Sequence, residues 1–401
     1  SWAKVTFKFS LGTTTRLFTN LLSRGRIEYR PCSLERLPYE LRMKVLRSIP
    51  ELSDLVSLVR ASSVFYQQYL KTKKSLLAGI LVMSLGGALV DAVAAHEAAA
   101  LRGDMSIKGD VVQQHLDRYK VRRKKYRSRM SDCLIDEYDE SFLLDIHRFW
   151  QAYARPLSLK CALFFLSRFD PQRPPTIDNL SATENIRLLR ALYRFELYSC
   201  LFGGESRVDQ LGFTEEEVLY NFFCLFRPWE VEEVFSVYAL IHEETGTCLR
   251  AMEKKLFHAV THELILIGGA ASCGLRGFDM ALTNTNFHSI ITVRPEHPQT
   301  SVYGLMENIL TPDVQASRRR LFPTCGDLAE QSGDPLPYVG EAEDQPSLGW
   351  VVVSKGDYIN AYGGSIYKPS PRSWGYVFWD MWRLTKMKGD EKLKSSRWAS
   401  G

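Results

Sequence analysis

Apolar residues recur at helical spacing near the start of the chain. Leu41, Val45 and Ile49 lie four residues apart, and Pro38 and Pro50 stand at the two ends of this run. A spacing of four residues places side chains on one face of a helix. Because proline is tolerated in the first turn of a helix but not in its interior, the run predicts one short helix between the two prolines.

A second apolar stripe follows, at Leu55, Leu58, Val59 and Ser62, and it predicts a second helix with Ser53 as its N-cap. The aromatic residues after the stripe predict a third helix. Three short helices bury little apolar surface on their own. They therefore have to pack on the rest of the chain or on a second protein.

The longest apolar run, residues 76–95, has the length of a membrane span. Asp91 lies inside it, and Gly86 and Gly87 interrupt its helical pattern. These features favour a pair of buried helices that is broken at the glycines, in a soluble protein with no membrane partner.

The rest of the chain is mostly helical in pattern. Residues 102–169 are a charged connector followed by aromatic helices, and a proline-rich stretch then leads to a C-terminal domain at 180–401. Two β-like runs, at 287–295 and 348–364, predict a small β element near the C-terminus. Residues 323–347, rich in proline, glycine and acids, predict a long loop.

Two helices of the C-terminal domain have clear start signals. Ser181 followed by Glu184 has the spacing of a capping box. Pro228 suits the first turn of a later helix, whose apolar stripe includes Val234. The predicted fold is therefore mainly α: an N-terminal three-helix module, residues 31–101, packed on a larger helical domain with a small β element.

Composition adds few constraints. The chain has 401 residues, of which 45% are hydrophobic, and a net charge of +5, as in an ordinary folded protein. The eight cysteines include no CxxC pair, which favours free thiols in a reducing compartment. Residues 1–30 are basic and predict a flexible arm, with a mitochondrial targeting segment as the alternative. We expect a cytoplasmic or nuclear location.

A basic run at residues 118–129 is a candidate surface for nucleic acid or for nuclear localisation. Stacking on bases would require more aromatic side chains than the run contains, so nucleic acid is the weaker expectation. The alternative is a solvated helix face that is neutralised by the acidic residues just after it. The eight basic residues are Arg118, Lys120, Arg122, Arg123, Lys124, Lys125, Arg127 and Arg129.

No motif in the chain predicts a catalytic residue, a metal or a cofactor. His258 and His262 have the spacing of two metal ligands on a helix but lack the HExxH pattern, and a solvated face explains them better. The glycines before Cys273 lack the ending of a phosphate-binding loop. An enzyme with a pocket in the C-terminal domain stays open as an alternative. Three tryptophans near the C-terminus are packing anchors or a recognition surface: Trp374, Trp379 and Trp382.

The segment "LERLPYELRMKVLRSIPELSDLVSLVRAS" resembles the F-box motif, over about residues 34–69. Its Leu-Pro, its Glu-Leu and its later Asp-Leu match the family, whereas Phe65 and its neighbours stand where the family usually has a tryptophan. The resemblance implies binding to a Skp-type adaptor of a cullin–RING ubiquitin ligase. The residues it places against that adaptor are Leu37, Pro38, Leu41, Val45, Ile49, Leu55 and Leu58.

Three further blocks, "LSATENIRLLRALYRFELYSCLFGG", "FRPWEVEEVFSVYALI" and "RSWGYVFWDMWRL", resemble a large group of F-box-like proteins of filamentous fungi. That group is largely without assigned activity. The expected function is therefore a non-catalytic one, in which the chain recruits a protein substrate to the ligase. A nuclear or nucleic-acid-associated factor and an enzyme are the alternatives.

Overall fold

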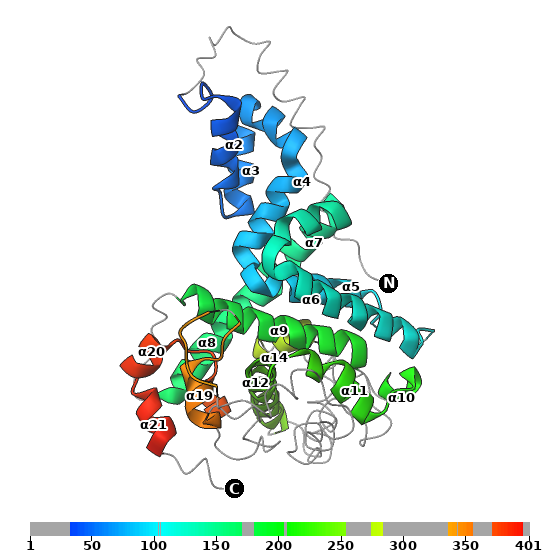
Figure 1. Ribbon diagram of the computed structural model, residues 1–401, viewed down its shortest axis with the longest axis vertical. Coiled ribbons are helices and arrows are strands. Elements are labelled where there is room, and N and C mark those ends of the chain that lie inside the picture. The colour runs from blue at the N-terminus through cyan, green and yellow to red at the C-terminus, as the bar shows by residue number, and fades with distance from the viewer. Residues whose placement is uncertain are drawn as a thin grey trace. The chain divides into compact units, whose positions relative to one another are not determined.

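The computed structural model describes residues 33–102, 104, 106–170, 180–203, 207–253, 274–283, 336–342, 344–355 and 371–395. Within these ranges the chain is mainly helical, as predicted, and contains no strand (Figure 1). Two compact units divide between Leu76 and Leu77, inside a helix. The boundary predicted after residue 101 is therefore wrong, and residues 102–169 belong to the same unit as the C-terminal region.

The N-terminal unit is built from helices α2 (Tyr39–Arg47), α3 (Leu52–Ala61) and the first part of α4 (Ser63–Leu85). Each helix contributes apolar side chains to a small core, which confirms the prediction of three helices. The buried apolar residues are Met43, Leu46, Leu55, Val59, Phe65 and Leu76.

Polar contacts join α2 and the loop before it to α4 and to the residue that precedes α4. Ser62 is the residue before α4: its hydroxyl accepts a hydrogen bond from the Phe65 amide at 3.3 Å and donates to the buried Glu35 carboxylate at 2.5 Å. Arg42 donates to Gln68 at 2.9 Å, and Gln68 donates to the Tyr39 carbonyl at 2.9 Å. These contacts supply partners for polar groups that would be costly to bury alone.

The N-cap expected at Ser53 is not present. Helix α3 begins at Leu52 after Glu51, and no side chain caps it. Ser53 lies in the first turn with its side chain exposed. Ser62, which the periodicity placed on the buried stripe of α3, is buried but serves the next helix.

The apolar run at 76–95 forms two helices that break at the glycines, as predicted. Helix α4 ends at Leu85, a short turn η1 (Gly86–Ala88) follows, and α5 (Leu89–Ala99) continues. Gly86 has φ = +49°, a conformation that favours glycine. The stretch Ser63–Ala99 is long and apolar enough to cross a membrane, but 67% of its most apolar window is buried within the structure. A core helix of a folded domain has the same character.

Helix α9 (Ala182–Phe202) is the centre of the second unit. It packs against α5, α8 (Arg155–Phe169), α12 (Pro228–Glu253) and α14 (Gly274–Thr283). Its capping box is present as predicted, with Ser181 accepting from the Glu184 amide at 3.1 Å and donating its own amide to Glu184 at 3.0 Å. Nearly every side chain of α9 is buried, so the helix has no solvated face.

The remaining helices surround this core. Helix α6 (Gly109–Glu137) carries the basic run, and α7 (Glu140–Phe149) leads through a π-helical turn, η2 (Trp150–Ala154), into α8. Short elements connect α9 to α12: α10 (Arg207–Leu211), α11 (Glu215–Asn221) and η3 (Phe223–Leu225).

The C-terminal segments are helical where the structure describes them: α19 (Leu348–Ser354), η6 (Pro371–Trp374), α20 (Met381–Lys386) and α21 (Gly389–Ser395). The β prediction for residues 348–354 is wrong. Ser347 caps α19 by accepting from the Trp350 amide at 3.3 Å, and the buried Trp350 ring packs edge-on against Trp229. Capping and burial of one tryptophan thus outweigh the strand preference of three valines. The run at 287–295 lies outside the described residues.

Candidate functional site

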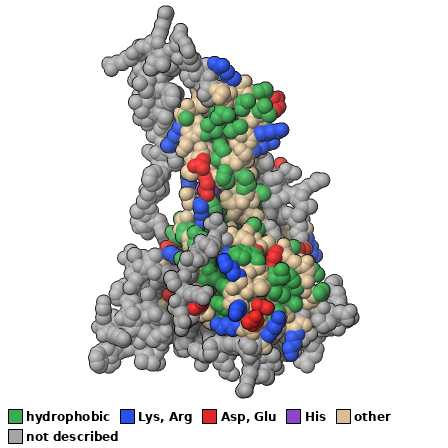
Figure 2. Space-filling model, turned by 90° about the vertical axis from the view of Figure 1, so that its left-hand side faces the viewer, with side chains coloured by type: hydrophobic (Ala, Val, Ile, Leu, Met, Phe, Trp, Pro, Cys, Tyr) green, Lys and Arg blue, Asp and Glu red, His purple; other side chains and the backbone are tan. Residues whose placement is uncertain are grey.

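The N-terminal unit leaves large apolar side chains exposed although it has its own core. Leu34, Tyr39, Leu41 and Leu70 are 42–50% exposed. Figure 2 shows hydrophobic side chains gathered on one face of this unit, with lysine and arginine side chains beside them. We call the outward side of α2, which carries the exposed Leu41, the α2 face.

Helix α2 presents its apolar residues in two directions. Met43 and Leu46 point into the core, whereas Leu41, two positions and about 200° from Met43, is exposed. Val45 follows Leu41 by four residues and is half-buried. One side of α2 therefore builds the module, and the other presents apolar surface to solvent.

The residues predicted to face an adaptor divide into three groups. Pro38 and Leu41 are exposed. Leu55 has no exposed surface and belongs to the core, so its assignment to the docking surface is wrong. Sequence periodicity identifies the apolar stripe that contains Leu55, but it does not show whether a residue of that stripe faces the core or a partner protein. The other four are half-buried: Leu37, Val45, Ile49 and Leu58.

Charge is unevenly divided along the chain. Residues 33–76 contain eight lysines and arginines and four acids, a net charge of +4. One of the acids, Glu35, is buried and bonded to Ser62. The surface of the N-terminal unit is therefore basic.

The basic run of α6 is partly used inside the fold. Arg122 pairs with Glu97 of α5 at 2.7 Å, and Arg123 pairs with Glu230 of α12 at 3.0 Å. Tyr119 is buried and donates a hydrogen bond to Asp91, so it is not available to stack on a base. Among the residues predicted to bind nucleic acid, these contacts remove Arg122 and Arg123 from a continuous surface.

The other members of the run are solvent-exposed or lie outside the described side chains. Arg118, Lys120 and Lys124 are exposed. The side chains of Lys125, Arg127 and Arg129 are outside the described part, as are the whole residues His258, His262 and Cys273.

Sequence reasoning missed a row of buried charges along α9. Glu184, Arg187, Arg190, Arg194 and Glu196 are each at most 4% exposed. They recur every two to four residues inside an otherwise apolar helix, and this spacing was the available signal. Charged residues are rarely buried to this extent unless they are paired, and each of these five has an ionic partner.

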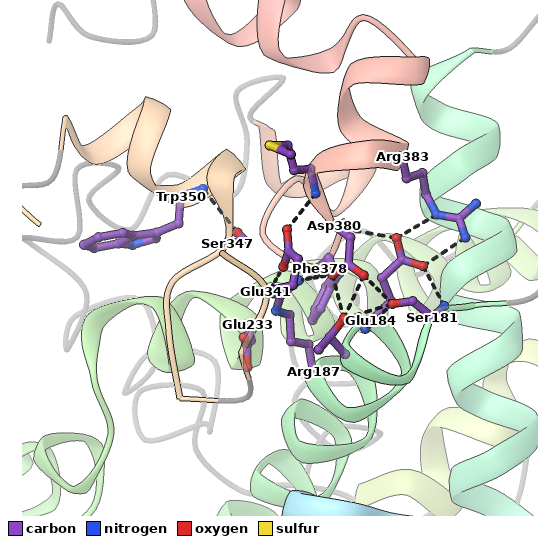
Figure 3. A network of polar contacts seen from close by, with 12 residues as sticks. Ser181, Glu184, Arg187, Glu233, Glu341, Ser347, Trp350, Phe378, Asp380 and Arg383 are labelled. Atoms are coloured by element: carbon purple, nitrogen blue, oxygen red, sulfur yellow. Dashed lines mark hydrogen bonds and ion pairs between the residues drawn. The ribbon is translucent and has the colours of Figure 1, made fainter. Parts of the chain in front are cut away.

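The first cluster of pairs lies at the start of α9 (Figure 3). Glu184 accepts two hydrogen bonds from one edge of the Arg383 guanidinium, from Nε at 2.8 Å and from Nη2 at 2.9 Å. Arg187 lies between Asp380 at 2.8 Å and Glu341 at 2.5 Å. The cluster holds two C-terminal segments against α9, and every carboxylate in it is occupied by a structural partner.

The second cluster joins α9 to α12. Glu233 pairs with Arg190, and Glu230 pairs with Arg194 at 2.8 Å. Glu232, which lies between Glu230 and Glu233 in sequence, pairs instead with Arg372 of η6 at 2.6 Å. Burial alone raises the pKa of the Glu230 carboxyl, but the guanidinium groups of Arg194 and Arg123 outweigh it and bring the pKa well below the usual value.

Two buried cysteines of the described part are structural. Cys161 and Cys200 have almost no exposed surface, and burial raises the pKa of both thiols. A protonated, buried thiol is a poor nucleophile. Of the three C-terminal tryptophans, Trp374 and Trp379 are packing residues, whereas Trp382 is 45% exposed.

Comparison with known proteins adds no relative: no protein-family profile, no curated protein and no solved structure matches this chain. The fold and the contacts above define a mainly helical protein with a small basic N-terminal unit and a larger unit held by buried ion pairs.

Proposed function

We propose that the N-terminal unit is an F-box-like docking module, which binds a Skp-type adaptor so that the chain recruits a protein substrate to a cullin–RING ubiquitin ligase. The observation behind this proposal is the α2 face. The exposed Leu41 on this face, and the neighbouring exposed Leu34 and Tyr39, are not part of the core of the module, which includes Met43, Leu46 and Leu55. The chain itself performs no catalysis in this proposal.

Apolar exposure supports an interface because it is concentrated. Single exposed leucines are ordinary, but Leu34, Tyr39 and Leu41 lie within eight residues and are each more than two-fifths exposed. Burying such side chains stabilises a complex by about 25 cal/mol per Å² of apolar surface, before the costs of association.

Charge identifies the kind of partner surface. The basic N-terminal unit is complementary to an acidic one, and such complementarity raises association rates and makes them fall with ionic strength. We therefore expect a partner that offers an apolar groove bordered by carboxylates. We also expect the affinity to weaken when the salt concentration is raised about tenfold, from about 50 to about 500 mM.

The test is binding of the full chain to a purified fungal Skp-type adaptor, measured by calorimetry. The variant is Leu37→Ala with Leu41→Ala, and the control is Leu159→Ala on α8. Leu159 is matched to Leu41 in residue type and in exposure, 41% against 42%. Loss of binding in the double variant alone supports the proposal. Equal binding by both variants, or no binding by the native chain, contradicts it.

A further inference from the structure

A cavity of about 520 Å³ lies within the second unit, and Glu196, at the end of the row of buried charges on α9, lines it. Helices α5, α7, α9 and α14 and the turn η2 form its walls. Cavities of about 300–1,000 Å³ hold small organic molecules. One wall is a π-helical turn, a rare feature that recurs at functional sites.

Apolar groups form most of this cavity's floor. Ala92, Ala95 and Ala99 come from successive turns of α5, and Ile146 comes from α7. Alanine on three consecutive turns leaves room that larger side chains would fill. The floor therefore suits the apolar body of a ligand.

One polar group in the wall has no partner in the described part of the chain. Tyr193 of α9 is 1% exposed, lines the cavity, and its hydroxyl forms no hydrogen bond there. Burial raises the pKa of Tyr193, so the hydroxyl stays protonated and can donate. A buried hydroxyl without a partner is costly, and a ligand acceptor would remove that cost.

The charges that line the cavity do not cancel. Glu196 pairs with Arg102 at 2.9 Å, and Asp145 pairs with Arg148 at 2.7 Å. Arg276 of α14 also lines the cavity and forms no ion pair with any residue that the structure describes. One guanidinium is therefore left over.

Arg276 is oriented by aromatic rings. Its guanidinium lies 5.5 Å from the centre of the Tyr153 ring and 6.0 Å from that of Phe149. Stacked in this way, a guanidinium keeps its N–H edge free for an anion, and a carboxylate fits that edge with two parallel hydrogen bonds. His96, the other basic group in the lining, has its pKa lowered by burial and by Arg276, against the opposing effect of Asp145 and Glu97, so it adds no charge at neutral pH.

We propose that this cavity binds a small organic monocarboxylate with an apolar body. The carboxylate binds Arg276, the apolar body lies on the alanine floor of α5, and the Tyr193 hydroxyl donates to a polar atom of the ligand. A monoanion matches the single unpaired guanidinium. This inference is independent of the docking function of the N-terminal unit.

The test uses the full chain and two probes of equal shape, titrated with ligand-observed NMR: 3-(4-hydroxyphenyl)propionate, whose phenol oxygen can accept a hydrogen bond from Tyr193, and its uncharged amide. For a probe this small, we expect an affinity of about 1–10 mM for the acid. The amide should bind at least about tenfold more weakly, since it cannot form the charged pair with Arg276.

Arg276→Gln should remove the preference for the acid over the amide, while Arg118→Gln, an exposed arginine of α6 outside the cavity, should keep it. Tyr193→Phe should weaken binding of the acid and, because it deletes an unpartnered hydroxyl, should not lower the melting temperature of the unliganded chain. Equal affinity for the two probes, an unchanged preference in Arg276→Gln, or no saturable binding by the native chain would overturn the proposal.

Discussion

Arg190 of α9 and Glu233 of α12 form a two-pronged ion pair in the interior of the second unit. The Arg190 Nε lies 2.6 Å from a Glu233 oxygen, and the two side chains are 4% and 1% exposed. At this depth neither charge has water as an alternative partner, so each depends on the other.

Removing one member of this pair should therefore be far more costly than removing both. We expect Arg190→Met to lower the free energy of unfolding by about 3–5 kcal/mol, because it leaves Glu233 buried without its partner. The double variant Arg190→Met, Glu233→Leu should recover most of that loss, since two apolar side chains fill the same space. Urea unfolding of the native chain, of Arg190→Met, of Glu233→Leu and of the double variant, followed by circular dichroism, gives the four values of the cycle.

An exposed pair supplies the control. Lys394 and Asp390 on α21 lie 3.5 Å apart, and Lys394 is 65% exposed. Lys394→Ala should change the free energy of unfolding by at most about 1 kcal/mol. A cost for Arg190→Met as small as that for Lys394→Ala would show that the buried pair does not hold α9 to α12.

Acid should destabilise the second unit through Glu230. Its pKa is well below the usual value in the folded chain because Arg194 and Arg123 outweigh burial. The unfolded chain therefore binds the proton more readily, and the stabilising contribution is complete above about pH 4.5 and is lost as the pH falls below it. Unfolding midpoints in urea, measured at steps from pH 7 to pH 3, should fall over the acid part of that range.

The variant Glu230→Gln isolates this group. It should be less stable than the native chain at pH 7, and the difference between the two should shrink as the pH falls. A difference that stays constant between pH 7 and pH 3 would mean that Glu230 ionisation does not contribute to the acid sensitivity.

Gly274 and Gly79 should respond in opposite ways to alanine. Gly274 has φ = +65°, and a Cβ there would lie 2.1 Å from a Glu196 oxygen. Gly79 is inside α4, and a Cβ there meets nothing within 4 Å. We expect Gly274→Ala to lower the melting temperature, and Gly79→Ala to raise stability by about 0.5–1 kcal/mol. Differential scanning calorimetry separates the two, and a tolerated Gly274→Ala would contradict the close packing against Glu196.

Ser62 and Ser53 test the capping of the N-terminal unit. Ser62 caps α4 and bonds to Glu35, whereas Ser53 is exposed and caps nothing. Ser62→Ala should cost about 1–2 kcal/mol, and Ser53→Ala should cost less than about 0.5 kcal/mol. Hydrogen exchange of the amides in the first turn of α4 reports the difference. Equal exchange in the two variants would assign the start of α4 to packing alone.

Several features of this protein could be predicted because their causes are local. The capping box at Ser181, the helix start at Pro228 and the break at Gly86 each depend on residues within one turn of the chain. The exposure of Leu41 could also be predicted, because its position after Pro38 resembles that of a partner-binding residue in the F-box motif.

Other features depended on partners that are distant in sequence. The helix at 348–354 has a strand-like composition, and the burial of Trp350 against Trp229 decides its form. Leu55 and Leu58 have equal hydropathy and belong to one stripe, yet only Leu55 is fully buried. A period of three to four residues identifies a helix face but does not say what covers it.

The sequence by itself determined that the chain is mainly helical and where many of its helices begin and break, since these follow from interactions within a few residues. Tertiary structure alone decided which charges are buried and with what they pair. Arg187 and Asp380 are 193 residues apart in sequence and 2.8 Å apart in space. A charge is stable in the interior only when it is paired with such a partner, and no pattern within a few residues of the sequence shows which distant residue that partner is.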